Sequence, residues 1–178
     1  MARRILGAIL AGGRSTRFGS DKALALLDGR LLIEHAAATL RPHVEKVVIC
    51  GRDDPRWACL PDRPEPGMGP LGGLAAALLH AHENGFEGVL STGCDMPSLP
   101  GELVQDLIGD APAVVEGQQL IGYWPSDLAL PLLDHLARCE RRSIREWMAV
   151  ARPRMVVPAG PLPNINRPED LAAWRARH

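Results

Sequence analysis

A glycine-rich segment near the N-terminus has the composition of a polyphosphate-binding loop. It begins at the end of the apolar run Ile5–Leu10 and reads LAGGRSTRFGSDK from Leu10 to Lys22. Within it stand three glycines and three cations, namely Gly12, Gly13, Gly19, Arg14, Arg17 and Lys22. Glycines let backbone N–H groups approach an anion closely, and cations offset the charge of a triphosphate. The segment has neither a GxGxxG nor a GxxxxGK[ST] pattern, so it predicts a phosphate site of another type. The alternative is a surface turn with solvated arginines.

Asp95 follows a second apolar run, in the sequence Gly93-Cys-Asp-Met-Pro97. If residues 88–92 form a strand of a parallel sheet, this carboxylate lies at the carboxyl edge of the sheet, where ligands bind. Proteins usually hold Mg²⁺ with one or two carboxylates together with the phosphates of a substrate. Asp95 is therefore predicted to hold Mg²⁺ beside a nucleotide. The alternative is a carboxylate that only caps the following turn.

Two further patterns occur at predicted helix starts. Asp62 precedes the run Gly67-Met-Gly-Pro-Leu-Gly-Gly73, where the free N–H groups of a helix start could close over a base or a ribose. The run Asn164-Ile-Asn166-Arg-Pro168 precedes two acidic residues, which is typical of a helix start. A ligand role for Asn164 or Asn166 on the acceptor side is an added hypothesis. In both segments, a purely structural helix start is the alternative.

Short apolar runs alternate with helical patterns, which predicts a mostly parallel sheet with helices on both faces. The expected strands are Ile5–Leu10, Lys46–Cys50, 88–92, 111–115 and 155–157. The expected helices are 32–40, 71–79, 126–138, 168–177 and one opened by a capping-box pattern at Ser143 and Glu146. The Pro- and Gly-rich stretch 61–73 is expected to form a long loop. Because ligands bind beyond the carboxyl ends of parallel strands, residues 12–22, 51–54 and 93–97 are expected on one edge.

The bulk composition is that of a globular protein and argues against several functions. Residues 1–178 are expected to form one domain. A net charge of −1 gives no basic field for a nucleic acid, and no apolar run is long enough to span a membrane. The four cysteines form no CxxC pair, which argues against a zinc site or a disulfide framework. We expect a cytoplasmic protein without nucleic-acid or membrane partners.

Four motifs together resemble those of the molybdenum cofactor guanylyltransferases, the MobA-like nucleotidyltransferases. They are LAGGRSTRFGSDKAL, GPLGGLAAAL, CDMP and NINRPEDL, and in this order they extend over nearly the whole chain. The resemblance implies an α/β protein with a three-layer, Rossmann-like nucleotidyltransferase fold and a mostly parallel sheet. It also implies that GMP is transferred from Mg–GTP to the terminal phosphate of molybdenum–molybdopterin. The products would be molybdopterin guanine dinucleotide and pyrophosphate, and the cofactor would be Mg²⁺.

The resemblance implies roles for particular residues as well. Lys22 would bind phosphate, Asp62 would lie in the nucleotide pocket, and Asp95 would hold Mg²⁺ and the nucleotide. Gly51 stands where the family often has Asn. The implied nucleotide-binding residues are Leu10, Ala11, Gly12, Gly13, Lys22, Gly51, Asp62 and Asp95. Lys22, Asp95 and Arg17 are the predicted catalytic residues. They would act by positioning and charge stabilisation, because the attacking phosphate is already ionised and needs no general base.

Two other functions remain open from the sequence. One is a cytidylyltransferase that acts on the same pterin or on a sugar or polyol phosphate. The other is a non-catalytic protein that binds a nucleotide or carries the pterin cofactor, although carriage alone does not need a metal-binding carboxylate. Beyond GTP and molybdenum–molybdopterin, the expected partners are molybdopterin-handling proteins or client molybdoenzymes.

Overall fold

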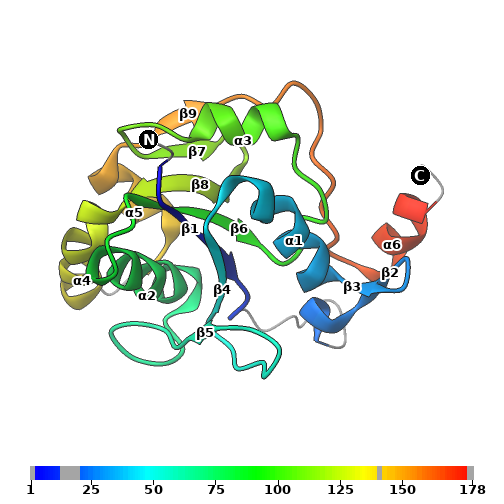
Figure 1. The fold of residues 1–178 in the computed structure, drawn as a ribbon, viewed down its shortest axis with the longest axis horizontal. Coiled ribbons are helices and arrows are strands. Elements are labelled where there is room, and N and C mark those ends of the chain that lie inside the picture. Colours follow the sequence, from blue (N-terminus) through cyan, green and yellow to red (C-terminus); the bar gives the residue numbers. More distant parts are fainter. Residues whose placement is uncertain (1–2, 13–20, 140–141, 176–178) are drawn as a thin grey trace.

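A seven-stranded sheet forms the centre of the molecule, in the order β5-β4-β1-β6-β8-β7-β9 (Figure 1). The computed structural model describes residues 3–12, 21–139 and 142–175. β1 pairs in parallel with both β4 and β6, whereas β8 runs antiparallel to its neighbours β6 and β7. The strands are β1 (Ile5–Leu10), β4 (Lys46–Cys50), β5 (Cys59–Leu60), β6 (Gly88–Gly93), β7 (Ala113–Val115), β8 (Gln118–Pro125) and β9 (Arg154–Val156).

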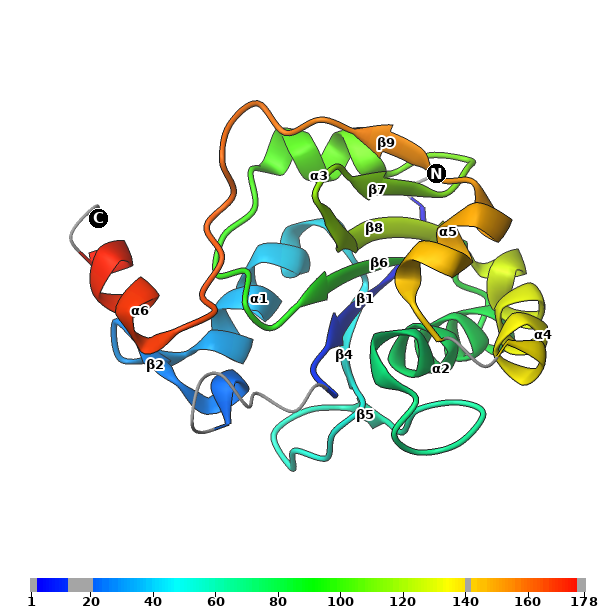
Figure 2. The ribbon, with the colours of Figure 1, turned by 180° about the vertical axis from the view of Figure 1, so that it is seen from behind.

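Helices cover both faces of this sheet, so that the structure has three layers (Figures 1 and 2). Two helices pack on one face, α1 (Leu32–Leu40) and α3 (Gly101–Leu107). The other face carries α2 (Gly69–Glu83), α4 (Ala129–Arg138) and α5 (Ile144–Ala151). The predicted α/β fold with a mostly parallel sheet and helices on both faces is confirmed.

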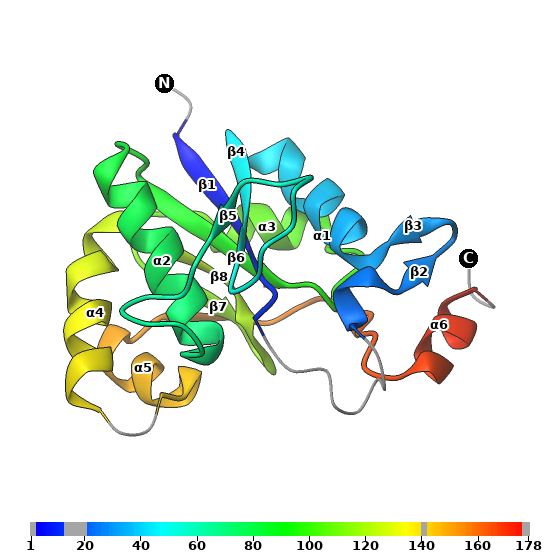
Figure 3. The same ribbon diagram turned by 90° about the horizontal axis from the view of Figure 1, so that it is seen from below.

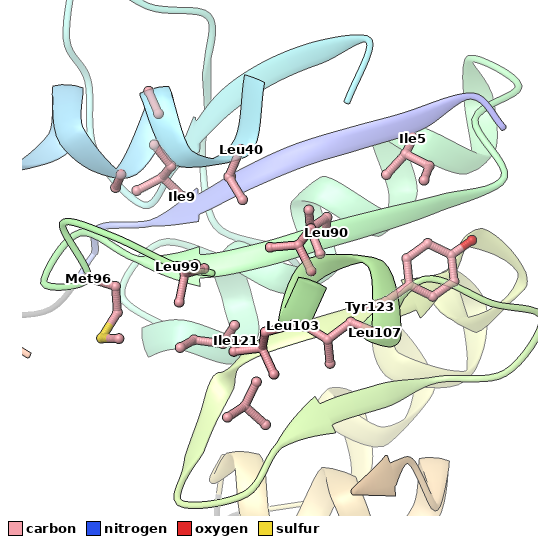
Figure 4. Close-up of a cluster of buried hydrophobic side chains, with 14 of the residues drawn as sticks. Ile5, Ile9, Leu40, Leu90, Met96, Leu99, Leu103, Leu107, Ile121 and Tyr123 are labelled. Carbon is pink, nitrogen blue, oxygen red and sulfur yellow. The ribbon is translucent and has the colours of Figure 1, made fainter. Parts of the chain in front are cut away.

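The side chains of β1 explain why this strand lies in the middle. Ile5 and Ile9 point to the face covered by α1, where they join a cluster with Leu40, Leu90 and others (Figure 4). Leu6 and Ala8 alternate with them and pack on the opposite face under α2. A strand that is apolar on both faces is typical of a parallel sheet buried between helices. The continuous apolar run in the sequence therefore predicted a buried strand, and the strand order places it between β4 and β6.

Helix α2 begins earlier than the sequence predicted. The helix was expected to begin just after Gly69 and Pro70, at the end of the Pro- and Gly-rich stretch 61–73; it begins at Gly69, and Pro70 lies in its first turn. Proline is tolerated there because the first N–H groups of a helix have no partner within the helix. The predicted helix is therefore confirmed, and the predicted loop ends before Gly69 rather than extending to Gly73.

Several elements were not predicted from the sequence. The most important is β8, which was not expected between the strands at 111–115 and 155–157 and which makes the sheet mixed. Helix α3 and strand β5 were also missed. The hairpin of β2 (Leu26–Leu27) and β3 (Arg30–Leu31) was not predicted either. Helix α6 (Pro168–Arg175) lies beside this hairpin (Figure 3). A small third core of Leu27, Leu32 and Ile165 joins this hairpin to the C-terminal segment. None of the helices in the described ranges has the length and apolar character needed to cross a membrane.

The buried face of α2 should carry much of the stability. Leu78 is fully buried in α2, whereas Leu130 on α4 is 60% exposed. We expect Leu78→Ala to lower the free energy of unfolding by about 2–5 kcal/mol, because a cavity is added to the lost apolar burial. Leu130→Ala is the matched control in another helix and should change it by less than about 0.5 kcal/mol. Urea denaturation measures both; equal effects would contradict the packing described here.

Candidate active site

The carboxyl ends of three strands meet at one edge of the sheet. Leu10 at the end of β1 pairs with Cys50 at the end of β4 and with Gly93 at the end of β6. The Ala11 N–H extends the pairing by donating to the Cys50 carbonyl at 3.0 Å. Gly12, Gly51 and Asp95 therefore follow neighbouring strand ends, as the parallel order predicts.

Lys22 reaches this edge from a short 3₁₀ helix, η1 (Lys22–Leu24). Its ammonium nitrogen lies 3.2 Å from Oδ2 of Asp95 and donates to Oδ1 of Asn166 at 2.9 Å. The two side chains of the ion pair are 12% and 25% exposed, respectively, so the pair is only partly accessible to water. Three residues widely separated in sequence thus meet at one point.

Local contacts hold Asp95 and Asn166 in place. An added Cβ at Gly93 would collide with Oδ1 of Asp95, so this glycine lets the carboxylate fold back over the end of β6. The Asp95 carbonyl accepts a hydrogen bond from the Ile165 N–H at 2.9 Å. This backbone hydrogen bond joins the two segments that carry Asp95 and Asn166.

The C-terminal asparagines differ in position. The Asn166 N–H donates to Oδ2 of Asp170 at 2.8 Å, as expected before a helix, while its side chain reaches Lys22. Asn164 does not reach the ion pair. It lines a neighbouring cavity of about 680 Å³ together with Ser98, Leu103 and Leu162. The structure thus brings one of the two predicted acceptor-side residues to Lys22 and leaves the other beside it.

Asp62 is buried beneath the strand ends. It is 7% exposed, and its Oδ2 accepts a hydrogen bond from the Met68 N–H at 3.1 Å. Its other oxygen, Oδ1, is buried and has no hydrogen-bond partner among the described residues. Burial raises the pKa of Asp62, and the N–H groups of Met68 and Gly67 oppose part of that rise. A buried carboxylate oxygen of this kind can accept a hydrogen bond from a ligand.

Gly51 lets the ends of β1 and β4 approach each other closely. Its φ is +81°, and an added Cβ would lie 2.7 Å from the Gly12 Cα and 2.9 Å from Oδ1 of Asp62. An asparagine here, as the resemblance implied, would require the ends of β1 and β4 to separate. In this chain, glycine instead lets the two backbones touch above Asp62.

The predicted nucleotide-binding loop is described in part. Leu10 and Ala11 are 7% and 9% exposed and belong to the core, while Gly12 is exposed at the edge. The Ala11 N–H is already bonded to Cys50, so it cannot also bind a ligand while the strands are paired. Gly13 and Arg17, which were predicted to bind the nucleotide and to stabilise charge, lie outside the described residues, as do Arg14 and Gly19.

The oxygen atoms around Lys22 fit a magnesium ion that is held jointly with a substrate. Asp95 and Asn166 both direct an oxygen at the Lys22 ammonium, so the two oxygens face a point where positive charge is already held. Oxygen atoms are the ligands that Mg²⁺ prefers. No three His, Cys, Asp or Glu side chains gather into a metal cage within residues 3–12, 21–139 and 142–175. Asp95 offers one carboxylate for such an ion, and substrate phosphates are the usual source of further oxygen ligands for Mg²⁺.

One contact at this edge was not foreseen. Arg52 follows Gly51 and forms a two-pronged ion pair with Asp21, the residue before Lys22, at 2.9 and 2.7 Å. Residues 51–54 were expected on this edge, but among them only Gly51 was predicted to have a role. The position of Arg52 directly beyond a strand end was the signal that could have found it.

Asp62 should cost stability at neutral pH. A carboxyl group whose pKa is raised by folding favours the folded state while it is protonated, and this contribution is lost as the pH rises through the folded-state pKa. We therefore expect Asp62→Asn to have a higher Tm than the parent protein at pH 7. The difference should vanish below the ordinary Asp pKa of 3.8.

Scanning calorimetry from pH 3 to 8 measures this difference. The exposed Asp127→Asn is the control and should show no comparable trend. A lower Tm for Asp62→Asn at pH 7 would mean that the charged form is stabilised in the fold, contrary to this prediction.

Comparison with known proteins shows the same fold and identifies the family. The sequence profile of the MobA-like NTP transferase domain matches residues 7–156. The molybdenum cofactor guanylyltransferase of Rhodobacter capsulatus is 40% identical in an alignment that covers 95% of this chain and 94% of that protein. Molybdopterin-guanine dinucleotide biosynthesis protein A from Archaeoglobus fulgidus has a similar structure, with a TM-score of 0.72, 22% identity and coverage of 97% and 100% of the two chains.

A cytidylyltransferase shares the fold as well. The 2-C-methyl-D-erythritol 4-phosphate cytidylyltransferase from Thermus thermophilus superposes with a TM-score of 0.69 at 18% identity, over 100% of both chains. At such identities the two structures establish the fold alone, whereas the profile and the R. capsulatus relative establish the family. The chain belongs to the MobA-like NTP transferase family.

Proposed function

We propose that this chain transfers GMP from Mg–GTP to the terminal phosphate of molybdenum–molybdopterin and releases pyrophosphate. The observation that carries the proposal is the Lys22 ammonium, 3.2 Å from the Asp95 carboxylate at the carboxyl edge of a mostly parallel sheet. The R. capsulatus relative, which is named for this activity, supports the choice of substrates. In this proposal, residues 1–178 form a single nucleotidyltransferase domain.

Catalysis in this proposal is positioning and charge stabilisation. The acceptor phosphate attacks the α-phosphorus of GTP in line with the leaving pyrophosphate, and it needs no base because it is ionised. Lys22 binds the triphosphate and offsets the charge that develops on the departing group. At 4 Å, one such charge pair is worth roughly 4 kcal/mol at an effective dielectric constant near 20, before the cost of desolvation. Arg17 is proposed to assist Lys22.

Asp95 is the proposed magnesium ligand, and Asn166 is the neighbouring oxygen donor. When bound, Mg²⁺ supplies positive charge to the phosphate oxygens. The present Lys22–Asp95 ion pair is compatible with this role. When substrate binds, the lysine would turn from Asp95 to a phosphate, and the carboxylate would turn from Lys22 to the metal. Neither charge is then left without a partner at the sheet edge.

The nucleotide is proposed to bind over Gly12 and Gly51, with Asp62 beneath. The unpartnered Oδ1 of Asp62 can accept a hydrogen bond from a hydroxyl or an N–H group of the nucleoside. The acceptor would approach from the other side of Asp95, along the cavity that Asn164 lines. Client molybdoenzymes or molybdopterin-handling proteins would take up the product. We place the reaction in the cytoplasm, in keeping with four free cysteines.

Removing either charged residue of the ion pair should abolish most activity. We expect Lys22→Ala and Asp95→Ala each to lower turnover by about 10²-fold or more, as loss of one preorganised charge does in other enzymes. Pyrophosphate release from GTP with Mg²⁺ and molybdenum–molybdopterin measures it. Lys46→Ala, at the other lysine of the chain, and Asp127→Ala are the controls and should keep wild-type turnover. Wild-type turnover in both site variants would refute the assignment.

Nucleotide choice separates the proposal from the cytidylyltransferase alternative, which the shared fold of the T. thermophilus enzyme keeps relevant. At about 100 times its dissociation constant, a ligand stabilises a protein by about 2.7 kcal/mol, or roughly 5–11 °C in Tm for a chain of this size. We expect Mg–GTP to produce such a shift and Mg–CTP at equal concentration to produce a much smaller one. A larger shift with CTP would favour the alternative.

A carrier protein would behave differently from both enzymes. It would show a nucleotide- or pterin-dependent Tm shift but no pyrophosphate release when acceptor is present. Mass analysis of the pterin product after incubation with GTP distinguishes the carrier from the transferase.

A further inference from the structure

The ion pair between Asp21 and Arg52 lies one residue from the proposed catalytic lysine. Nη1 of Arg52 donates to Oδ1 of Asp21 at 2.9 Å, and Nη2 donates to Oδ2 at 2.7 Å. This is the planar two-pronged geometry that arginine forms with carboxylates and lysine cannot form. The pair connects the segment before Lys22 to the end of β4, 31 residues further along the chain.

The position of Arg52 is fixed by its surroundings. Its side chain is 17% exposed, and its Nε is buried without a hydrogen-bond partner among the described residues. Of the nearby acids, Asp54 is already paired with Arg56. Within the described residues, Asp21 is therefore the carboxylate that pairs with Arg52, through both of its Nη atoms. The two parallel hydrogen bonds to one carboxylate fix the orientation of this half-buried guanidinium.

Asp21 transmits this attachment to Lys22. It is the N-cap of η1, because its Oδ1 accepts a hydrogen bond from the Ala23 N–H at 3.2 Å. Its carbonyl also accepts from the Leu24 N–H at 3.1 Å, which closes the turn. One carboxylate thus both caps the turn that starts with Lys22 and anchors that turn to the edge of the sheet.

We propose that Arg52 is a positioning residue that holds Lys22 at the active site through Asp21. The inference rests on the proposed function, because it assigns Arg52 a task in the same phosphate site. An isolated turn of three residues has little stability of its own. Without the anchor at β4, the direction of the Lys22 side chain would depend on contacts with Asp95 and Asn166, the two groups that it must leave to bind a triphosphate.

A direct electrostatic action of Arg52 on the phosphates is the competing explanation, and two conservative substitutions separate the two. Arg52→Lys keeps the positive charge but loses the two-pronged contact. Asp21→Asn keeps a side-chain oxygen for the N-cap but loses the charge that orients Arg52. If Arg52 acts through Asp21, both variants should lower turnover by a similar factor, about 10-fold or more, since small displacements of catalytic groups are costly. If charge alone mattered, Arg52→Lys would keep wild-type turnover.

The decisive experiment places these substitutions in a Lys22→Ala background. When Lys22 is absent, a residue that acts through it has nothing left to position. Arg52→Lys and Asp21→Asn should then change kcat/KM by less than about 2-fold, whereas independent sites would lower it by the same factor as in the wild-type background. Arg56→Lys, which disturbs the other arginine–aspartate pair of the same segment, is the matched control and should change little in either background.

The binding of a polyphosphate tests the role of Arg52 independently of the reaction. Tripolyphosphate binding, followed by calorimetry at low ionic strength, should weaken about 5-fold or more in Arg52→Lys and Asp21→Asn, with no further loss when Lys22 is already alanine. If tripolyphosphate binding changes across the variants as expected but the wild-type protein transfers no GMP, only the proposed function is refuted. Equal losses in the presence and absence of Lys22, or wild-type behaviour of Arg52→Lys, would overturn the positioning role.

Discussion

Parallel pairing of β1 with β4 on one side and β6 on the other is the constraint on which the site depends. It places Leu10, Cys50 and Gly93 in one row, so the residues that follow each of them emerge at the same edge. Three segments that are far apart in sequence become neighbours through backbone hydrogen bonds alone. Because β1 is apolar on both faces, burial under helices on each side keeps it in the centre and keeps this row fixed.

The charged groups at this edge form a connected set. Arg52 contacts Asp21, Asp21 caps the turn of Lys22, and Lys22 contacts both Asp95 and Asn166. Each cation faces an oxygen, so the folded protein leaves no described charge of this set unpaired. Groups that are partly removed from water interact more strongly than exposed ones, and their geometry is therefore better defined. Such an arrangement suits a site whose task is to hold several phosphates in a fixed orientation.

Asp62, in contrast to these paired groups, is a buried carboxylate with an incomplete set of hydrogen bonds. Its burial disfavours the charged carboxylate, and one of its oxygens has no partner within the described residues. The contact between Gly12 and Gly51 lies directly above it, and a side chain at position 51 would collide with both. Packing alone would favour an uncharged residue at such a position, which agrees with the proposed role of Asp62 in binding the nucleotide.

The sequence by itself determined the elements whose pattern is local. The apolar run of β1, the helical spacing in α1 and α2, the capping pattern of Ser143 before α5 and the helix start at Pro168 were predicted and are observed, with boundaries shifted by a few residues. It also predicted that residues 12, 51 and 95 would share an edge, because this follows from strand direction. The tertiary structure alone decided that β8 enters the sheet antiparallel, since this strand mixes glutamines, a glycine and aromatic residues and its burial depends on β6 and β7. It also selected Asn166 over Asn164 as the partner of Lys22 and paired Asp21 with Arg52. These contacts join residues 144 and 31 positions apart, respectively, and no periodicity in a sequence encodes distances that arise only when the strands pair.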